Sequence, residues 1–415
     1  MQGKTLIIAG GGAAGFFCAV NAAEKNPGLK VIILEKSNKL LSKVRISGGG
    51  RCNVTHACFD RHQLVKRYPR GERFLKKSFV HFSPEETVSW FAKRGVQLKT
   101  EEDGRMFPVS DDSGTIISCL LDAATRRGVQ VLLHQEVKKL SRIGELWQVD
   151  CGSENYKADF VCIACGGYPK PAMFQWLTEL GHTAASPVPS LFTFNIGDKI
   201  LNNLMGISIP DAQVKIMGSK LMERGPVLVT HWGLSGPAVL RLSAWGAREL
   251  AALNWHFKVQ TNWIPEYNEN SLRSFLQQFR FEKAAMKVVN RNPFSLPQRF
   301  WEYHLEIAGI NAETRWSDLP SKEQNRLIKN LCAQEFEVKG KTTFKEEFVT
   351  AGGINLAEVD PDTMESRLNK NLFFAGEVLD VDGVTGGFNF QHAWTSGFVA
   401  ALAISTRLTE RPVKA

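Results

Sequence analysis

The residues best suited to chemistry are the glycines that open the chain, in the run Gly10-Gly11-Gly12-Ala13-Ala14-Gly15. In a GxGxxG pattern the first glycine permits a tight turn, the second lets the backbone approach a pyrophosphate, and the third lets a helix pack on a strand. Glu35 follows about 20 residues later, where a carboxylate accepts hydrogen bonds from ribose hydroxyls. These residues predict a dinucleotide site that disfavours NADP.

A second glycine run, Ser47 to Asn53 (SGGGRCN), carries a charge, a thiol and an amide. Three glycines in a row allow a backbone to lie against a flat ring. Arg51 is a candidate to hold a pyrophosphate or an RNA phosphate. Cys52 either protonates a substrate carbon as a general acid or only packs in the core, and the usual behaviour of free cysteine favours packing.

The elements around the first glycines have the order that the motif needs. An apolar run, Lys4–Ala9, leads into them, and apolar residues recur at helical spacing from Phe16 to Lys25. A second apolar run, Val31–Leu34, ends at the acid. The pattern predicts a βαβ unit whose helix N-terminus, with its positive dipole end, faces the phosphates. This unit alone leaves both NAD and FAD open.

Two later segments favour FAD. Tyr156–Ala164 reads as a strand that ends just before Gly166, and Asn371–Ala375 reads as another. Gly386 and Gly387 then precede a helix that we expect from Phe390. A helix N-terminus at that point would stabilise the negative charge that a reduced flavin carries near N1 and O2. A ligand reached from both ends of the chain must be long, and FAD is long enough.

Four strings resemble the YhiN/BaiN-like family of bacterial flavoproteins: KVRISGGGRCNVTH (43–56), THWGLSGPAVL (230–240), VTAGGINL (349–356) and FFAGEVLDVDGVTGGFNFQHAWTSG (373–397). The resemblance covers essentially the whole chain. It implies FAD, a glutathione-reductase-like doubly wound domain and an inserted domain. For some members it implies dihydrouridine formation in 23S ribosomal RNA, and for another branch the reduction of unsaturated bile-acid-like ketones. Both reactions saturate a C=C bond conjugated to a carbonyl.

The motifs and the resemblance together give the expected FAD contacts. They are Gly10, Gly12, Ala13, Ala14, Gly15, Glu35, Lys36, Lys43, Ser47, Gly50, Arg51, Cys52, Asn53, Val137, Ala164, Gly166, Gly376, Glu377, Asp382, Gly386, Gly387 and Phe388. Because the chain has one GxGxxG and no second nucleotide motif, we expect NAD(P)H to bind transiently at the flavin face, or another donor to reduce FAD. No His/Cys cluster has metal-ligand spacing, so no metal is expected. Cys162 and Cys165 lie on a predicted strand, so they are expected to be core residues rather than a redox pair.

The expected fold class is α/β, with a doubly wound FAD-binding domain interrupted by a β-barrel-like and helical-bundle insert. Short strands separated by turn dipeptides predict a β subdomain over 191–265, and 3.6-residue periodicity predicts a helical subdomain over 266–340. The FAD domain would comprise 1–190 and the return segment 341–415. Eight scattered cysteines in a chain of 415 residues are typical of a reduced cytoplasmic protein. The glycine-interrupted apolar stretch near the start predicts neither a secretory signal nor a membrane span.

The net charge of +9 is concentrated in residues 36–77, a segment that contains twelve basic residues and two acidic ones. Such a local cluster indicates a polyanion surface, although a solvated face is the commoner alternative. Tyr68 and Phe74 in the same segment are candidates to stack on a flipped base. The predicted phosphate ligands are Arg61, Lys66, Arg67, Arg70, Arg73, Lys76 and Lys77.

The favoured hypothesis is an FAD-dependent reductase acting on a uridine of 23S ribosomal RNA, either in the RNA or in a large-subunit assembly intermediate. Hydride would reach C6, and Cys52 or a water would protonate C5. One alternative is an ene-reductase of a small conjugated ketone, and another is an RNA-binding flavoprotein without turnover. The uridine, the electron donor and the oligomeric state stay open.

Overall fold

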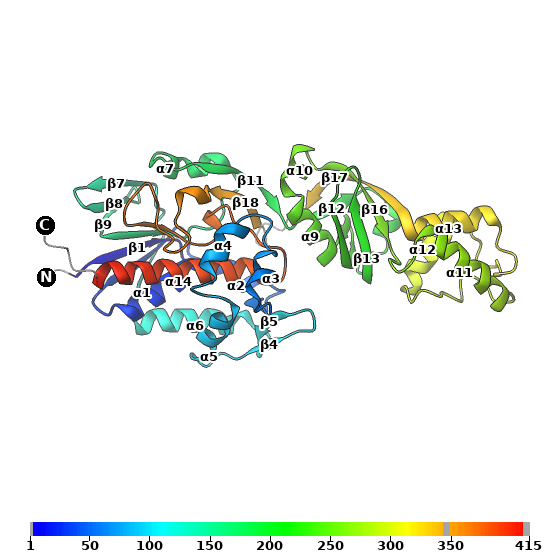
Figure 1. The fold of residues 1–415 in the computed structure, drawn as a ribbon, viewed down its shortest axis with the longest axis horizontal. Helices are drawn as coiled ribbons and strands as arrows, with labels where there is room; N and C mark the ends of the chain where they lie inside the picture. Colours follow the sequence, from blue (N-terminus) through cyan, green and yellow to red (C-terminus); the bar gives the residue numbers. More distant parts are fainter. Residues whose placement is uncertain (1–2, 343–348, 410–415) are drawn as a thin grey trace. The chain divides into compact units, whose positions relative to one another are not determined.

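The computed structural model describes residues 3–342 and 349–409 and divides them into two compact units (Figure 1). The first unit contains the chain up to Pro189 and the described residues after 348. The second, inserted unit begins at Ser190. The chain therefore leaves one unit, builds the other, and returns to the first.

A five-stranded parallel sheet forms the centre of the first unit, in the order β19-β10-β1-β2-β6. Its strands are short and mostly buried, as expected for a sheet covered on both faces. They are β1 (Thr5–Ala9), β2 (Lys30–Glu35), β6 (Gln130–Leu133), β10 (Phe160–Ile163) and β19 (Leu372–Phe374). The first strand thus lies in the middle, with strands from distant parts of the sequence beside it.

Two long helices from opposite ends of the chain, α1 (Ala13–Lys25) and α14 (Phe388–Thr409), lie side by side (Figure 1). Their approach is close, because a Cβ built on Gly397 would lie 2.6 Å from the Ala14 carbonyl oxygen. The rings of Phe17 and Trp394 pack between them at a centroid distance of 5.2 Å. This contact joins the GxGxxG helix to the helix that follows the last glycines.

Smaller elements complete the first unit. Antiparallel sheets with the orders β7-β8-β9 and β3-β5-β4 and a β11-β18 pair accompany the parallel sheet. The strands are β3 (Thr55–His56), β4 (Leu98–Thr100), β5 (Arg105–Pro108), β7 (Lys139–Ile143), β8 (Leu146–Asp150), β9 (Asn155–Ala158), β11 (Ala184–Ser190) and β18 (Val349–Ile354). The helices are α2 (Ser42–Ile46), α3 (Arg61–Val65), α4 (Glu72–Ser78), α5 (Pro84–Ala92), α6 (Ser113–Arg126) and α7 (Gln175–Thr178).

The inserted unit contains a closed six-stranded barrel and a group of helices that share one apolar core. In barrel order the strands are β12 (Thr193–Ile196), β15 (Gly233–Ser235), β14 (Met222–Thr230), β13 (Ser208–Ile216), β16 (His256–Asn262) and β17 (Gln334–Thr342). The helices are α8 (Lys199–Asn202), α9 (Pro237–Trp245), α10 (Ala247–Ala252), α11 (Glu269–Glu282), α12 (Gln298–Ala308) and α13 (Ser321–Ala333).

The expected fold class is confirmed, and two local expectations are corrected. The segment Tyr156–Ala164 is not one strand, because Asp159 separates β9 from β10, which belong to different sheets. The helical part ends at Ala333 rather than at 340. The next residues alternate between buried and exposed and form β17, which closes the barrel. Within residues 3–342 and 349–409, no helix is long and apolar enough to cross a membrane.

Candidate active site

The first glycine turn has the geometry that the motif predicts. A Cβ on Gly10 would lie 2.3 Å from the Ala164 carbonyl oxygen, and one on Gly15 would lie 2.0 Å from the Gly10 oxygen. A Cβ on Gly12, by contrast, would meet no atom within 4 Å. The backbone at Gly12 therefore borders open space at the N-terminus of α1. That helix has no side-chain cap and no acid in its first turn, so its positive end is available to an anion.

Glu35 lies at the end of β2, and both of its carboxylate oxygens accept hydrogen bonds. One oxygen accepts a hydrogen bond from the Gly11 N–H at 2.8 Å, and the other accepts from the Ser37 N–H at 2.9 Å. The backbone N–H of Gln135 donates to the Glu35 carbonyl at 2.9 Å, which brings the loop that contains Val137 to the same edge of the sheet. The Gln135 side-chain oxygen is buried without a partner among the described residues. Lys36 is exposed next to this edge.

The end of β19 meets the start of α1. A Cβ on Gly376 would lie 2.8 Å from the Ala14 Cβ. Glu377 connects two further segments, because one carboxylate oxygen accepts from the Thr350 N–H at 2.9 Å and the other pairs with Lys43 Nζ at 2.5 Å. The Thr350 hydroxyl nearby is buried and has no partner in the described part of the chain.

The second glycine run is anchored to the start of α14. In the orientation that satisfies its neighbours, the Asn53 amide oxygen accepts from the Gly387 N–H at 3.0 Å. A Cβ on Gly50 would meet nothing within 4 Å, so this turn also borders open space. The Arg51 guanidinium pairs with Glu101 at 2.6 Å and lies 4.0 Å from the centre of the Phe107 ring. The bond to Glu101 raises the pKa of Arg51.

The structure favours the packing role for Cys52. Its side chain is fully buried by the chain's own atoms, and its backbone N–H donates to the Ser47 carbonyl at 2.9 Å. Burial raises the pKa of the Cys52 thiol to about 12. A thiol with that pKa and no exposed surface is a poor proton donor to a substrate. The eight cysteines are all free, so Cys162 and Cys165 are not joined.

The helix α14 begins at Phe388, two residues earlier than expected and directly after Gly386 and Gly387. The basic segment, residues 36–77, is hydrogen-bonded to the start of this helix and to the loop before it. Tyr68 donates its hydroxyl hydrogen to the Phe388 carbonyl at 2.7 Å, and the Val384 N–H donates to the Arg67 carbonyl at 2.9 Å. The His56 ring stacks on the Phe388 ring at a centroid distance of 4.7 Å.

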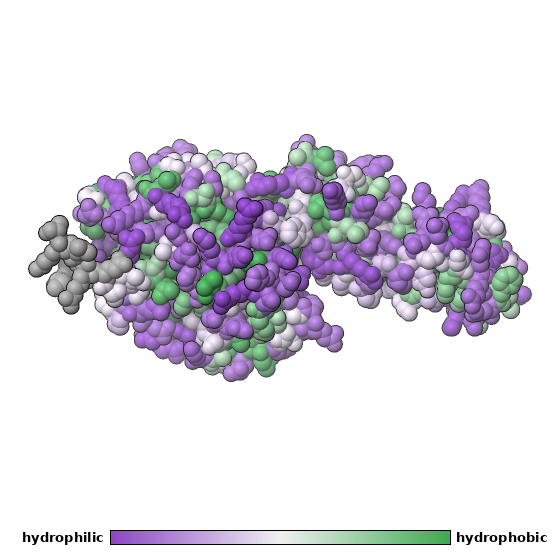
Figure 2. All heavy atoms as spheres, in the orientation of Figure 1, coloured by the Kyte–Doolittle hydropathy of each residue, from purple (hydrophilic) through white to green (hydrophobic). Residues whose placement is uncertain are grey.

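Most of the predicted phosphate ligands lie on the surface of α3, α4 and their connection. Figure 2 shows mainly hydrophilic side chains over these helices. Six of these ligands are exposed: Arg61, Lys66, Arg67, Arg73, Lys76 and Lys77. None of the six forms an ion pair with a carboxylate among the described residues, so their charges are available to a polyanion.

Four predicted contacts need correction. The Arg70 side chain is only 14% exposed and forms a two-point ion pair with Asp382, which is fully buried. Arg70 therefore compensates a buried charge instead of binding RNA, and Asp382 has no surface to offer FAD. Tyr68 and Phe74 are also buried, so neither ring can stack on a base. Sequence reasoning missed the β4–β5 hairpin that holds Arg51, although the Asp103-Gly104 dipeptide at its turn is a signal for one.

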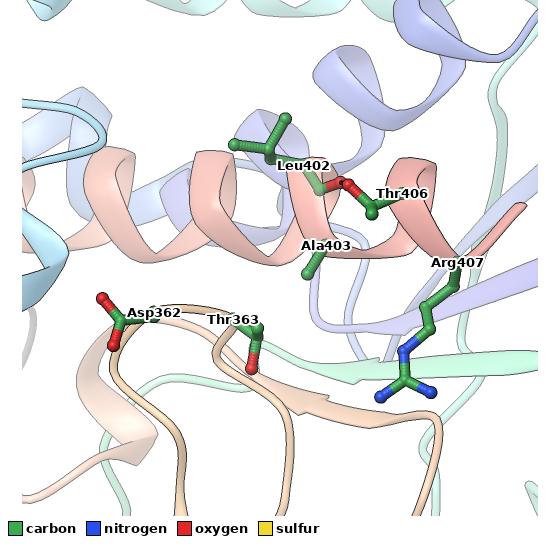
Figure 3. Close-up of a pocket in the computed structure, with 6 residues that line it drawn as sticks. All are labelled: Asp362, Thr363, Leu402, Ala403, Thr406 and Arg407. Carbon is green, nitrogen blue, oxygen red and sulfur yellow. Dashed lines mark hydrogen bonds between the residues drawn. The ribbon is translucent and has the colours of Figure 1, made fainter. Parts of the chain in front are cut away.

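A separate cavity of about 500 Å³ lies along the C-terminal half of α14 (Figure 3). Asp362, Thr363, Leu402, Ala403, Thr406 and Arg407 line it. It is distant from Gly386 and Gly387, because residues 388 and 402 of a helix are separated by about 20 Å. Among the described residues no group of three or more His, Cys, Asp or Glu side chains could hold a metal.

Comparison with known proteins agrees with this geometry. The model of the HI0933-like protein Rossmann domain matches residues 4–403. The chain belongs to this family. It is an FAD-dependent oxidoreductase, and the open space at Gly12, the uncapped α1 N-terminus and the orphaned polar atoms near Glu35 and Glu377 fit FAD.

Three characterised relatives span nearly the whole chain. Ribosomal RNA dihydrouridine synthase of Haemophilus influenzae is 29% identical and that of Escherichia coli 28%, covering 96% and 97% of this chain and 98% of each relative. The 3-dehydro-bile acid delta(4,6)-reductase of Clostridium scindens is 26% identical over 96% of this chain and 98% of its own. The structure of 3-ketosteroid delta1-dehydrogenase from Sterolibacterium denitrificans is similar in fold, with a TM-score of 0.53. The match covers 97% of this HI0933-like chain and 100% of the dehydrogenase chain, at 13% sequence identity.

Proposed function

We propose that this HI0933-like protein reduces a uridine of 23S ribosomal RNA to dihydrouridine, in the RNA or in a large-subunit assembly intermediate in the cytoplasm. The observation that carries the proposal is the attachment of the basic segment to the start of α14. Six exposed cations, which form no ion pair among the described residues, lie on α3, α4 and their connection. That connection is hydrogen-bonded through Tyr68 to Phe388 and through Arg67 to Val384. Two of the relatives carry the same activity in their names.

Different groups of the chain would bind the cofactor and the RNA. Gly12 and the α1 N-terminus bind the cofactor's pyrophosphate, and Glu35 accepts from its ribose. The α14 N-terminus at Gly387 stabilises negative charge at the flavin end. The six exposed cations hold RNA phosphates, and the target base must leave its stack to be reached. When bound and reduced by NAD(P)H as a transient donor, FAD would supply the hydride for C6. Because Cys52 is buried, we assign protonation of C5 to a water.

The decisive experiment is to measure dihydrouridine in 23S ribosomal RNA from cells that lack this gene and from the same cells with the gene restored. Loss and recovery at one uridine is the expected result. An unchanged dihydrouridine pattern would refute the RNA substrate.

A second candidate is an ene-reductase of a small conjugated ketone, which the full-length similarity to the bile acid reductase supports. The two candidates differ in their use of the basic segment. Charge reversal of Lys66, Arg67 and Arg73 would leave a small-molecule reductase active but would abolish RNA reduction. RNA affinity should also fall steeply with salt, since each neutralised phosphate releases counterions.

A further inference from the structure

One large aromatic side chain of the basic segment lies on its surface. Phe59 is 45% exposed, whereas Tyr68 and Phe74 are 1% and 7% exposed. A half-exposed phenylalanine presents a flat apolar face to solvent, which carries a cost unless a partner covers it. The two rings that sequence reasoning selected for base stacking are in the core, and Phe59 is the exposed one among the phenylalanines and tyrosines of residues 36–77.

The backbone on both sides of Phe59 is fixed by hydrogen bonds. The Ala57 N–H donates to the Gly104 carbonyl at 2.8 Å, which extends the β3–β5 pairing. Asp60 caps α3, because its Oδ1 accepts from the N–H groups of His62 at 2.7 Å and Gln63 at 3.1 Å. The exposed ring is therefore held on an ordered segment, so little conformational freedom is lost when it binds a partner.

The surroundings of Phe59 are cationic. Arg61 and Lys66 are exposed on and after the helix that follows Phe59. Arg67 is also exposed, and its positive charge acts on the thiol of Cys58, the residue before Phe59. The nearest acid in the sequence, Asp60, is engaged in capping α3. An exposed aromatic ring among exposed cations matches a polyanion that carries flat apolar rings. That description fits single-stranded nucleic acid, because its phosphates meet the cations and its unstacked bases meet the ring.

Phe59 also lies close in the chain to the candidate active site. His56, three residues earlier, stacks on Phe388, the first residue of α14. Arg67 is hydrogen-bonded through its carbonyl to Val384, in the loop before α14. A nucleotide seated on Phe59 would thus be held beside the segment that leads to the flavin end of the site.

We propose that Phe59 is a stacking platform for an unpaired base of the RNA substrate, next to the uridine that is reduced. The inference rests on the proposed function and specifies how the RNA is held. Cations alone hold a duplex and a single strand alike, but a ring that stacks requires an unstacked base. The protein should therefore prefer single-stranded RNA over the same strand in a duplex, and Phe59 should carry that preference.

The test compares FAD-loaded wild-type protein with Phe59→Ala, Phe59→Trp and a matched control, Val80→Ala. Val80 is an exposed apolar residue without a ring, just after α4 and three positions beyond the basic segment. Binding of a fluorescent mixed-sequence single-stranded RNA, alone and annealed to its complement, is measured by anisotropy over a series of salt concentrations. Flavin absorbance and thermal unfolding confirm that each variant is folded.

We expect Phe59→Ala to bind the single strand about tenfold more weakly, to bind the duplex as the wild type does, and to keep the same slope of affinity against salt. Phe59→Trp should restore affinity, and Val80→Ala should not change it. Equal affinity of Phe59→Ala and wild type, or a loss that tryptophan does not restore, would overturn the inference alone. A wild-type protein that binds no RNA would overturn both the inference and the proposed function. RNA binding that depends on Phe59, in a protein that forms no dihydrouridine, would overturn the proposed function and leave only the stacking of an RNA base on Phe59.

Discussion

The hydroxyl of Tyr68 donates to the main-chain carbonyl of Phe388 at 2.7 Å, across a buried contact between residues 320 positions apart in the sequence. This bond joins the connection between α3 and α4 to the first turn of α14. Together with the Arg70–Asp382 ion pair and the bond from Val384 to Arg67, it connects the exposed cations to the glycines that precede α14. The surface proposed to hold RNA is therefore part of the same packed structure as the cofactor site.

Removing this hydroxyl should loosen the link. We expect Tyr68→Phe to lower the free energy of unfolding by about 1 kcal/mol, because a buried carbonyl loses a partner. Flavin retention during dilution should fall with it. Tyr156→Phe is the control, since that hydroxyl bonds only to an exposed Glu154. Thermal unfolding and flavin content measure both effects, and equal losses in the two variants would contradict the role given to Tyr68.

The glycines of the first turn separate cofactor binding from folding. Gly12→Ala adds a methyl group where the chain has open space, so the apoprotein should keep its stability while flavin content falls sharply. Gly15→Ala forces a Cβ against the Gly10 carbonyl and should cost at least about 2 kcal/mol of stability. Gly28→Ala, also in open space but outside the motif, should change neither quantity. Full flavin content in Gly12→Ala would place the pyrophosphate elsewhere.

Replacing Cys52 tests whether it transfers a proton. Loss of a general acid typically lowers the rate by about 10²–10⁴-fold. Because the thiol is buried and its pKa is raised to about 12, we expect Cys52→Ala to change kcat less than about tenfold. Its cost should appear in thermal stability as a small core cavity. A hundredfold loss of kcat with intact flavin content would instead restore Cys52 as the acid.

His392 makes stability depend on pH. Its Nε2–H donates to the Gly376 carbonyl at 3.1 Å, its Nδ1 is buried without a partner in the described chain, and burial lowers its pKa from 6.5 to about 4. Between pH 6.5 and pH 4, His392 therefore binds a proton in the unfolded chain but not in the folded chain. The stabilising contribution is complete above pH 6.5 and is lost as the pH falls towards 4.

Urea unfolding at pH 7 and pH 5 measures this contribution. We expect the wild type to lose about 2 kcal/mol more than His392→Asn between these values. Other buried histidines contribute equally to both proteins and cancel. His62→Asn, at an exposed position, should behave as the wild type. The same pH dependence in wild type and His392→Asn would show that His392 is not responsible.

Local patterns predicted much of this molecule. The βαβ unit, the strand before Gly376 and the helix after Gly387 follow from apolar periodicity and glycine placement, which act over neighbouring residues. The burial of Tyr68 and the pairing of Arg70 with Asp382 do not, because they depend on which distant segment packs against α4. The closure of the barrel by β17 was missed for a similar reason. Residues 334–342 follow directly on a helix, and their strand partners, β12 and β16, lie far away in the sequence.

The packing of α1 against α14 has a consequence for how the protein is made. The glycine-turn helix leaves the ribosome well before its partner helix, because most of the described residues lie between α1 and α14. Until α14 has been made, the face of α1 around Phe17 lacks Trp394, and the nascent chain has no complete pocket for its cofactor. We therefore expect FAD capture to follow the synthesis of α14. A product truncated before α14 would keep an intact GxGxxG yet carry no flavin, and its uncovered apolar helix would make it a target for chaperones and proteases.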